Sequence, residues 1–407
     1  MAFSTALSGL TAASTDLDVT ANNIANSNTV GFKQARAQFS DVYAAGAVNL
    51  NSTVIGQGVR VSSTAQQFSQ GNITTSTSNL DLAISGDGFF TLKSANGPVY
   101  SRNGQFGEDK SGNVISGTGQ ALQVYPPLAN GGFNTGTLAN LNLQTAQSAP
   151  LATTTGTVIL NLPANTTPPT VTPFDPTNSL TYNQSTSTTV FDSLGNAYPA
   201  TLYFSQQATP ANTWSVNMTV NGVSAGPAQT LTFGSTGAVT APAGGGLNFN
   251  GFTPTSGANP LALAFNFGQT TQYGGRFGVT SITQNGYATG QLSTVAIDPT
   301  GVVSAVYTNG RSTQLGQLAM ANFPNPQGLK ELGDTNWTET FSSGTVVQGV
   351  AGSAGFGSIQ SGALESSNVD LTTQLVRMIT AQRAFQANAQ VITTANQESQ
   401  TVINIGR

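Results

Sequence analysis

The chain of 407 residues contains no histidine and no cysteine, and it has few charged residues. Without histidine it lacks the usual general base, the usual member of a nucleophilic triad and a common zinc ligand. Without cysteine it can form no disulfide framework and can use no thiolate chemistry. No pair of carboxylates lies in an apolar motif like those of glycosidases. We therefore expect a protein that is not an enzyme and that uses no cofactor or metal.

Positive charge is also scarce, because 12 Lys and Arg stand against 16 Asp and Glu, for a net charge of -4. Nucleic-acid binding is not expected, since phosphate contacts need clustered basic side chains. No apolar run reaches the length of a membrane-spanning helix, and Met1–Leu10 has neither the basic region nor the cleavage site of a signal peptide. We expect an exported protein without a cleaved signal peptide and without membrane insertion. Residence in the cytoplasm is the alternative.

Both ends of the chain carry an apolar stripe at helical heptad spacing, in which residues recur at steps of four and three. The stripe residues are Phe3, Leu7, Leu10, Leu17 and Ile24 at the N-terminal end, and Leu371, Leu375, Met378, Phe385, Ile392 and Ile403 at the C-terminal end. Isolated helices are marginal in water, so these helices need apolar surface from a partner. We expect them to pack between subunits of an assembly. An ordinary helical hairpin within one chain is the alternative.

Local signals mark where each terminal helix ends or begins. The Asn-rich stretch from Asn22 to Asn28, followed by Gly31, predicts the end of the first helix, because Asn and Gly tolerate the left-handed conformation. Asn368 is the predicted N-cap of the last helix, with Asp370 in its first turn, where a carboxylate favours the positive end of the helix dipole.

The residues between the two helical ends predict short antiparallel strands. Three turns have Asp at the first position and Gly at the fourth, at residues 109–112, 192–195 and 298–301, which is the chemistry of a type I turn. Apolar runs of strand-like composition flank each turn. Composition shifts near residues 146 and 284 delimit an almost uncharged insert, which indicates one β domain carried inside another.

The predicted fold class is therefore mixed, with N- and C-terminal α-helices that form a coiled-coil-like inner domain and two mainly antiparallel β domains nested between them. The predicted division is a helical inner-core domain at 1–30 and 366–407, an irregular connector at 31–70, a discontinuous inner β domain at 71–145 and 285–365, and an outer β domain at 146–284.

Two segments resemble the signatures of the bacterial flagellar rod and hook protein family. The first spans residues 22–33 and the second residues 362–371, continuing through 381–386. The matching signature residues are Asn22, Asn23, Ile24, Ala25, Asn26, Gly31, Phe32, Ser367, Asn368, Val369 and Asp370. Internal motifs at 86–90, 101–106 and 284–287 are similar to those of hook proteins.

Within this family, an insert as long as 146–284 resembles the outer domain of a hook subunit. The resemblance implies a homopolymer in the extracellular flagellar hook, a hollow, curved and flexible tube that is attached to the basal body and transmits torque from rod to filament. It also implies contacts with the distal rod protein, the hook cap protein, the hook-filament junction protein and the flagellar type III export apparatus. Such a subunit is exported without a cleaved signal peptide.

Two alternatives remain open at the level of the sequence. The first is the distal rod protein, which is shorter and lacks an outer domain of this size. The second belongs to another class, a secreted adhesin or glycan-binding β protein in which aromatic residues such as Trp214 and Tyr203 line the site.

Overall fold

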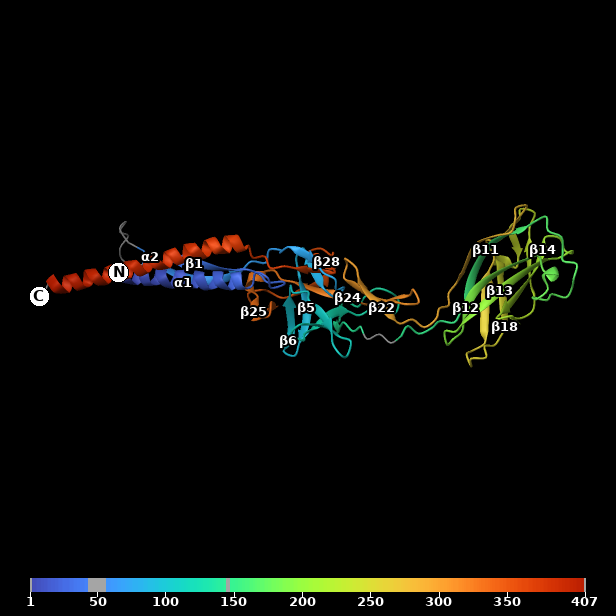
Figure 1. The fold of residues 1–407 in the computed structure, drawn as a ribbon, viewed down its shortest axis with the longest axis horizontal. Coiled ribbons are helices and arrows are strands. Elements are labelled where there is room, and N and C mark those ends of the chain that lie inside the picture. The colour runs from blue at the N-terminus through green and yellow to red at the C-terminus, as the bar shows by residue number, and fades with distance from the viewer. Residues whose placement is uncertain (1, 43–55, 144–146, 406–407) are drawn as a thin grey trace. The chain divides into compact units, whose positions relative to one another are not determined.

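The described structure, a computed structural model, covers residues 2–42, 56–143 and 147–405 and is mostly β-sheet, with a long helix at each end of the chain (Figure 1). It divides into two compact units. Unit 1 comprises Met1–Gln144, Val295–Ala305 and Thr313–Arg407, and unit 2 comprises Thr145–Thr294 and Val306–Ser312. The predicted combination of terminal helices and intervening β structure is confirmed.

The two long helices, α1 (Ala2–Ala25) and α2 (Leu371–Ile405), lie side by side and run antiparallel (Figure 1). Near the end of α1 and the start of α2, the Asn23 amide donates to Oε1 of Gln374 at 3.3 Å. Gly9 near the start of α1 lies against Asn388, further along α2. Helix α1 ends within the Asn-rich stretch as predicted, and Gly31 beyond it has a φ of +70°.

Helix α2 is capped by Asp370 and not by Asn368, so the predicted N-cap is wrong. Asp370 Oδ1 accepts a hydrogen bond from the N–H of Thr373 at 2.8 Å, which is the contact of an N-cap side chain. The Asn368 amide instead donates to the carbonyl oxygen of Gln67, and its Oδ1 accepts from the N–H of Gln34, both at 2.8 Å. Both residue types cap helices well, and tertiary contacts decided between them.

The predicted irregular connector at 31–70 is wrong over much of its length, because it contains a β-hairpin. Strand β1 (Ala35–Asp41) pairs antiparallel with β2 (Val59–Gln66). The hairpin follows α1, and Ser8 Oγ on α1 accepts a hydrogen bond from the N–H of Val59 at 3.1 Å. Alternation of apolar and polar residues in 35–40 is the strand signal that the connector interpretation missed. Residues 43–55, which are part of the same predicted connector, lie outside the described residues.

The main sheet of unit 1 is built from both halves of the chain, with the strand order β22-β23-β24-β9-β5-β6-β26-β25. Strand β24 pairs with both β5 and β9, although the whole of unit 2 separates them in sequence. The shorter pairs β28–β4 and β29–β3 also join the two halves. The strand bounds are β3 Ile73–Thr75, β4 Leu82–Ser85, β5 Phe89–Ser94, β6 Gly97–Ser101, β7 Phe106–Glu108, β8 Val114–Ser116, β9 Ala121–Tyr125, β10 Ala139–Asn140, β22 Leu292–Ile297, β23 Val302–Tyr307, β24 Ser312–Asn322, β25 Lys330–Gly333, β26 Asn336–Thr338, β27 Val347–Val350, β28 Ser358–Ser361 and β29 Ala363–Glu365.

Unit 2 consists of two sheets around one apolar core, with the orders β18-β19-β11-β20 and β12-β13-β14-β16-β17. Side chains alternate between buried and less buried along β11 and β13, as expected for strands with one face on a core. Most pairings are antiparallel, but β11 runs parallel to β19 and β20. The bounds are β11 Thr155–Pro163, β12 Gln184–Phe191, β13 Ala197–Gln206, β14 Thr213–Val220, β15 Val223–Ser224, β16 Gln229–Phe233, β17 Val239–Ala241, β18 Gly246–Phe252, β19 Leu261–Asn266, β20 Thr271–Tyr273 and β21 Gly278–Gln284, with short helices η1 Ser179–Thr181 and η2 Ala243–Gly245.

The limits of the two units differ from the predicted domain limits. Residues 285–294 and 306–312 were assigned to the inner β domain but belong to unit 2. Tyr287 forms a β-bridge with Leu151, and the Asn309 amide donates to the carbonyl oxygen of Ala288 at 2.8 Å. These contacts hold the returning segment against the start of unit 2, which the composition shift near residue 284 did not reveal.

The three Asp-x-x-Gly turns form as predicted, and in each the glycine N–H donates to the aspartate carbonyl oxygen at 2.9–3.0 Å. Asp192 is fully buried, and its carboxylate accepts hydrogen bonds from the N–H of Asn196 and from Ser256 Oγ, both at 2.9 Å. Burial raises the pKa of Asp192, but the hydrogen bonds from Asn196, Ser256 and the Leu194 N–H outweigh it and leave that pKa below its usual value. This carboxylate therefore ties the turn to the body of unit 2.

We predict that Asp192→Asn lowers the free energy of unfolding of unit 2 by about 1–3 kcal/mol at neutral pH, because charge-assisted hydrogen bonds are lost. A lowered pKa contributes stability above the unfolded pKa of about 3.9 and loses it as pH falls through the folded value. The difference between wild type and variant should therefore shrink on acidification.

The measurement is urea unfolding between neutral pH and about pH 2, followed by Trp214 fluorescence in a Trp337→Phe background. The control is Asp175→Asn, whose carboxylate is exposed and should matter less. A difference that stays constant as the pH falls would contradict the role of the Asp192 carboxylate.

Candidate assembly interface

The contact face between α1 and α2 is made largely of small side chains. Ala6 and Ala13 on α1 and Ala381 on α2 are buried. At Gly9 an added Cβ would lie 2.7 Å from Oδ1 of Asn388, so the helices approach too closely there for a larger residue without a shift. The distance between two packed helices depends on the side chains at their contact. The helices therefore pack closely while using few of their large apolar residues.

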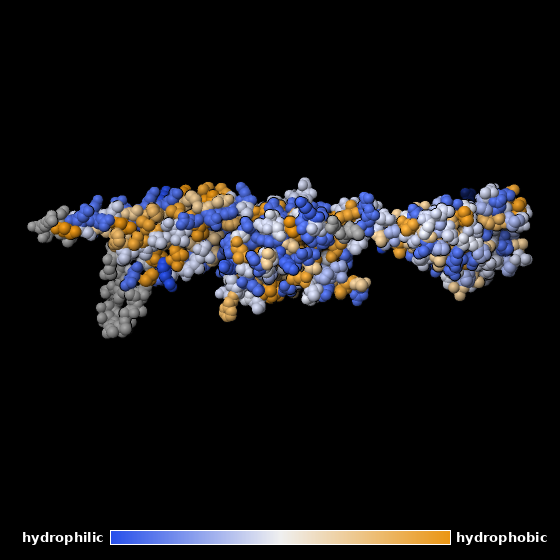
Figure 2. All heavy atoms as spheres, turned by 90° about the horizontal axis from the view of Figure 1, so that it is seen from below, coloured by the Kyte–Doolittle hydropathy of each residue, from blue (hydrophilic) through white to orange (hydrophobic). Residues whose placement is uncertain are grey.

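Five residues of the predicted stripes remain exposed on the helix pair. They are Phe3 (48%), Leu7 (48%), Leu371 (47%), Leu375 (45%) and Ile403 (66%). The other six, Leu10, Leu17, Ile24, Met378, Phe385 and Ile392, are half-buried. Val376, Ile379 and Val391 on α2, which lie outside the predicted stripe, are exposed as well. Figure 2 shows such apolar side chains at the surface of the helical part of unit 1.

The buried face of α2 is displaced by one residue from the predicted stripe. Gln374 and Ala381 are buried, whereas Leu375, which belongs to the predicted stripe and follows Gln374, is exposed. A chain that buried its largest side chains inside this pair would place Leu375 inward. Among the described residues, the single chain therefore leaves several large apolar side chains of its helices exposed.

A buried ionic cluster joins the chain's two ends at the base of the helices. Lys33 Nζ lies 2.6 Å from Oε1 of Glu365, and an Arg102 guanidinium nitrogen lies 3.1 Å from Oε2 of the same carboxylate. The Lys33 ammonium also donates to the carbonyl oxygen of Ser69, and the Gly71 N–H donates to Glu365, both at 2.8 Å. Each partner in the cluster thus compensates another that burial has removed from water.

Burial lowers the pKa of Lys33, and the neighbouring Arg102 acts in the same direction, whereas Glu365 opposes both effects. Burial likewise lowers the pKa of Arg102, and Glu365 again opposes the shift. The carboxylate of Glu365 therefore favours the charged form of Lys33 and pairs with the guanidinium of Arg102.

Amide side chains continue this cluster toward the helices. The Asn23 side chain forms two hydrogen bonds with the backbone of Ala35, at 2.8 and 2.9 Å, and a third with Gln374. The Gln374 amide donates to Gln34 at 3.0 Å, and the Gln34 N–H donates to Asn368. Helix α1, strand β1 and the start of α2 are therefore fixed to one another by polar side chains.

The signature residues from the two ends of the chain meet at this cluster. Asn23 and Phe32 are buried there, and an added Cβ at Gly31 would lie 2.5 Å from the backbone nitrogen of Asn103. Asn26 bonds to Asn22 within the turn that ends α1, Ile24 is half-buried, and Ala25 is exposed. Ser367 Oγ accepts from the N–H of half-buried Val369, just before the cap at Asp370.

Lys33, Glu365, Arg102 and Gln374 were not predicted as site residues. Lys33 and Glu365 lie inside the two quoted signatures, and Arg102 lies inside the motif at 101–106. Their convergence was not visible from spacing, because Lys33 and Glu365 are 332 residues apart. The signal that could have pointed to this cluster is that Lys33, Arg102 and Glu365 are among the few charged residues of the chain and lie within the family motifs.

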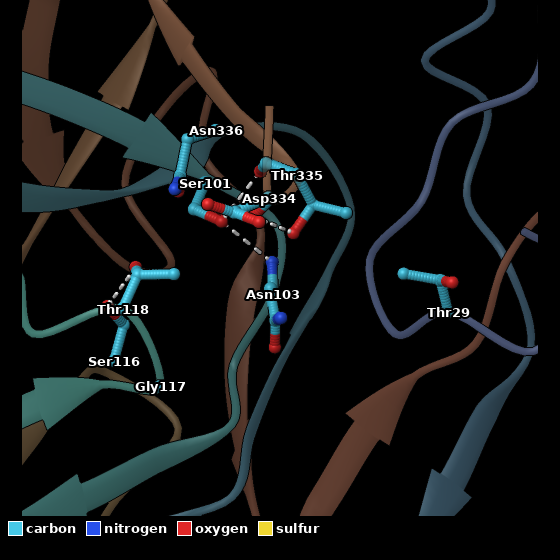
Figure 3. Close-up of a pocket in the computed structure, with 9 residues that line it drawn as sticks. All are labelled: Thr29, Ser101, Asn103, Ser116, Gly117, Thr118, Asp334, Thr335 and Asn336. Carbon is cyan, nitrogen blue, oxygen red and sulfur yellow. Dashed lines mark hydrogen bonds between the residues drawn. The ribbon is translucent and has the colours of Figure 1, made fainter. Parts of the chain in front are cut away.

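A pocket of about 220 Å³, lined mostly by serine, threonine and asparagine residues, lies beside the cluster in unit 1 (Figure 3). Its lining residues are Thr29, Ser101, Asn103, Ser116, Gly117, Thr118, Asp334, Thr335 and Asn336. Ser101 Oγ donates to the carbonyl oxygen of Thr335 at 2.9 Å and accepts from the N–H of Asn103 at 3.1 Å. The Ser101 and Ser116 hydroxyl groups form hydrogen bonds with neighbouring residues of the pocket. The described lining contains one carboxylate, Asp334, and no second acid or base, so no catalytic arrangement forms here.

No group of three or more potential metal ligands is found among the described residues. Within the same residues, neither helix combines the length and apolar character needed to cross a membrane.

The glycan-binding alternative conflicts with the position of Trp214. This side chain is fully buried in the core of unit 2, where no sugar can stack on it. Tyr203 is half-buried and packs against Tyr182 and Phe174, with ring centroids 4.8 and 5.2 Å away. The aromatic residues proposed for that site do not form a common surface.

Four known sequence families match successive parts of the chain. The family described as flagella basal body rod protein matches residues 3–33, and the flagellar hook protein FlgE/F/G D1 domain matches 83–173. The flagellar basal body protein FlaE D2 domain matches 161–287, and the flagellar basal body rod FlgEFG protein C-terminal family matches 360–405. The matches thus include the insert that the sequence motifs left unmatched.

Curated relatives match over the whole length. The flagellar hook protein FlgE of Escherichia coli K12 is 41% identical over 416 residues, covering 100% of both chains. The flagellar hook protein FlgE of Salmonella typhimurium LT2 is 39% identical over 417 residues, again with 100% of both chains covered. A crystal structure of Helicobacter pylori flagellar hook protein FlgE2 aligns with 72% of this chain and 100% of its own, with a TM-score of 0.52 and 14% identity, and supports the fold.

The terminal helices, the signatures that meet beneath them and the matched families define a structural subunit of the bacterial flagellum, in a class that is not enzymatic. The chain belongs to the flagellar hook protein FlgE family. It is therefore a structural subunit of the polymeric flagellar hook, and the distal rod alternative is wrong.

We predict that Glu365→Gln destabilises unit 1 by about 3–5 kcal/mol, because Lys33 and Arg102 are left buried without their carboxylate. The measurement is urea unfolding followed by Trp337 fluorescence in a Trp214→Phe background. Glu108→Gln, which changes an exposed carboxylate of unit 1, is the control and should stay within about 0.5 kcal/mol of wild type. An unchanged unfolding midpoint in Glu365→Gln would show that the cluster does not hold the two ends together.

Proposed function

We propose that this subunit builds a hollow, curved and flexible tube that transmits torque from the rod to the filament, with paired α1 and α2 helices forming a coiled-coil-like inner wall. The exposed apolar side chains on the helix pair carry this proposal. Small residues bring α1 and α2 together, and large residues such as Phe3, Leu371 and Leu375 are left outside. In a helical polymer, these side chains would be buried against the helices of neighbouring copies.

The energies favour such burial. Each large apolar side chain contributes roughly 1.5–3 kcal/mol when it moves from water to a packed interface. The five exposed stripe residues and the three further ones on α2 are each about half exposed, so roughly half of that gain remains available per side chain. Subunits that repeat the same contact with rotation and translation propagate as an open helix.

The β structure supplies the layers outside this wall in our proposal, in the predicted order of inner and outer β domain. The chain has no basic residue between Lys110 and Arg276, a range that includes most of the insert. The only acidic residues of the insert are Asp175 and Asp192. Few charges mean few fixed ion pairs between neighbouring subunits, and polar, water-bridged contacts can exchange while the tube bends.

The proposed partners and location rest on the family. We place the hook outside the cell, attached to the basal body, with the distal rod protein below it, the hook-filament junction protein above it and a hook cap protein at its growing end. Export through the flagellar type III apparatus without a cleaved signal peptide completes the proposal. A cysteine-free chain suits that route, since no crosslink can form before or during export.

We predict that Leu375→Asp abolishes assembly into tubes, because a carboxylate would be buried in the wall without a partner. Electron microscopy of the full chain under salting-out conditions, which strengthen apolar burial, is the measurement. The matched control is Leu180→Asp on η1 of unit 2, where another exposed leucine, 63% exposed against 45% for Leu375, receives the same change.

Curved hollow tubes from wild type and Leu180→Asp, with monomers from Leu375→Asp, would support the proposal. Tubes from Leu375→Asp would show that the helical surface does not build the wall. Straight tubes from wild type would contradict the proposed curvature. The β units of Leu375→Asp should unfold at the same urea concentration as those of wild type.

A further inference from the structure

Phe341 is the most exposed large apolar side chain in the described part of the chain, with a relative exposure of 104%. It lies in the loop that follows β26, in unit 1. Apolar residues that are scattered singly over a surface are normal in proteins. A phenyl ring with no cover at all in a well-built loop is a different case, because its whole apolar area remains in water.

Phe341 lies in the segment 339–344, which we call the Phe341 loop. A dense set of hydrogen bonds holds this loop. Ser343 is fully buried, and its Oγ donates to the carbonyl oxygen of Thr340 at 2.8 Å and accepts from the Thr340 N–H at 2.9 Å. The Thr340 hydroxyl donates to the carbonyl oxygen of Gly328 at 2.5 Å. The residues on both sides of Phe341 are therefore fixed.

The short helix η3 (Pro326–Gly328) supports the loop from the other side. The Asn325 amide donates to the carbonyl oxygen of Ser342 at 2.9 Å, and the Asn325 N–H donates to that of Ser343 at 3.2 Å. An added Cβ at Gly328 would lie 2.5 Å from the backbone of Ser342, so the two backbones are in direct contact. The loop conformation is thus determined by packing, which fixes the backbone position of Phe341.

The base of the Phe341 loop rests on an aromatic core. Trp337 in β26 is buried and packs edge-on against Phe89, with ring centroids 5.7 Å apart. Phe323 packs against Tyr100 at 4.8 Å in the same cluster. Charged residues flank the loop, since Glu339 begins it and Lys330 pairs with the last residue of β26 in the sheet register.

Interfaces draw most of their energy from a few rigid aromatic residues surrounded by polar ones. A loop whose backbone is already ordered loses little backbone entropy on binding, so more of the burial energy of its side chain is retained. The Phe341 loop has both properties, an aromatic side chain on a fixed backbone with charges at its base. Other exposed apolar residues of unit 1, such as Leu332 and Val347, lie within strands and keep about half their surface covered.

We propose that the Phe341 loop is an anchor through which unit 1 docks on a second copy of this chain. The hook is a polymer of this subunit, so the surface that surrounds each copy is mainly that of other copies. In this proposal the contact is heterologous, which means that Phe341 of one subunit enters a different surface of its neighbour. This contact is separate from the helical wall, and it rests on the polymeric function already stated.

Thiol labelling tests the proposal directly, because the chain contains no cysteine and a single substitution gives a single reactive site. Phe341→Cys in the full chain should react quickly with a maleimide reagent as a monomer and at least tenfold more slowly in assembled tubes. Val223→Cys, in the exposed turn at β15 of unit 2, is the control for general exclusion of the reagent from tubes. A Phe341→Cys rate that is unchanged on assembly, or that falls no more than the control, overturns the proposal.

Assembly itself gives the second measurement. Phe341→Ala should raise the critical concentration for tube formation about tenfold, which corresponds to about 1.4 kcal/mol per subunit. Phe341→Trp should assemble near the wild-type concentration, because it restores an aromatic anchor. Leu128→Ala, which removes another exposed apolar side chain of unit 1, should have little effect. Wild-type behaviour of Phe341→Ala, or an equal loss in Leu128→Ala, overturns the anchor role.

The wild-type chain separates this inference from the proposed function. Failure of wild type to form tubes counts against the tube itself. Wild-type tubes together with a freely reactive Phe341→Cys leave the tube in place and remove only the docking contact of the Phe341 loop.

Discussion

The carboxylate of Glu365 is the point on which the rest of unit 1 depends. It holds Lys33, which lies between α1 and β1, and Arg102, which follows β6, and all three side chains are buried. Removing charges from water is expensive, and the cost is recovered only when every partner is present. The cluster therefore forms only after both ends of the chain have reached the same place. It specifies where α2 starts relative to α1, more than it adds stability.

That constraint explains the unusual character of the helix pair. Because polar contacts at Asn23 and Gln374 set the relative position of the helices, their contact face needs few large apolar residues. Alanine and glycine allow close approach, and residues such as Leu371 and Leu375 become available at the surface. A pair that buried these side chains within one chain would leave little with which to bind other copies. The subunit is thereby built for polymerisation.

The β units use a different strategy, with full cores and surfaces of low charge. In unit 2, Trp214 and its neighbours fill the space between two sheets, and Asp192 ties a turn to that core. In unit 1, the aromatic cluster around Trp337 supports the loop that exposes Phe341. Both units thus have well-filled apolar cores, and the polymer is built from units whose folds do not depend on many surface charges.

The sequence by itself determined the terminal helices, the Asp-x-x-Gly turns and the family, because caps, turn chemistry and signature motifs are local patterns of residue type. It missed the hairpin in 31–70 and placed the cap at Asn368, where local signals were weak or equal. It also could not orient the stripe on α2 or show that Lys33, Arg102 and Glu365 meet. Only the tertiary structure decided the orientation of α2 and the meeting of these charges, because both depend on contacts between residues that are hundreds of positions apart in the chain.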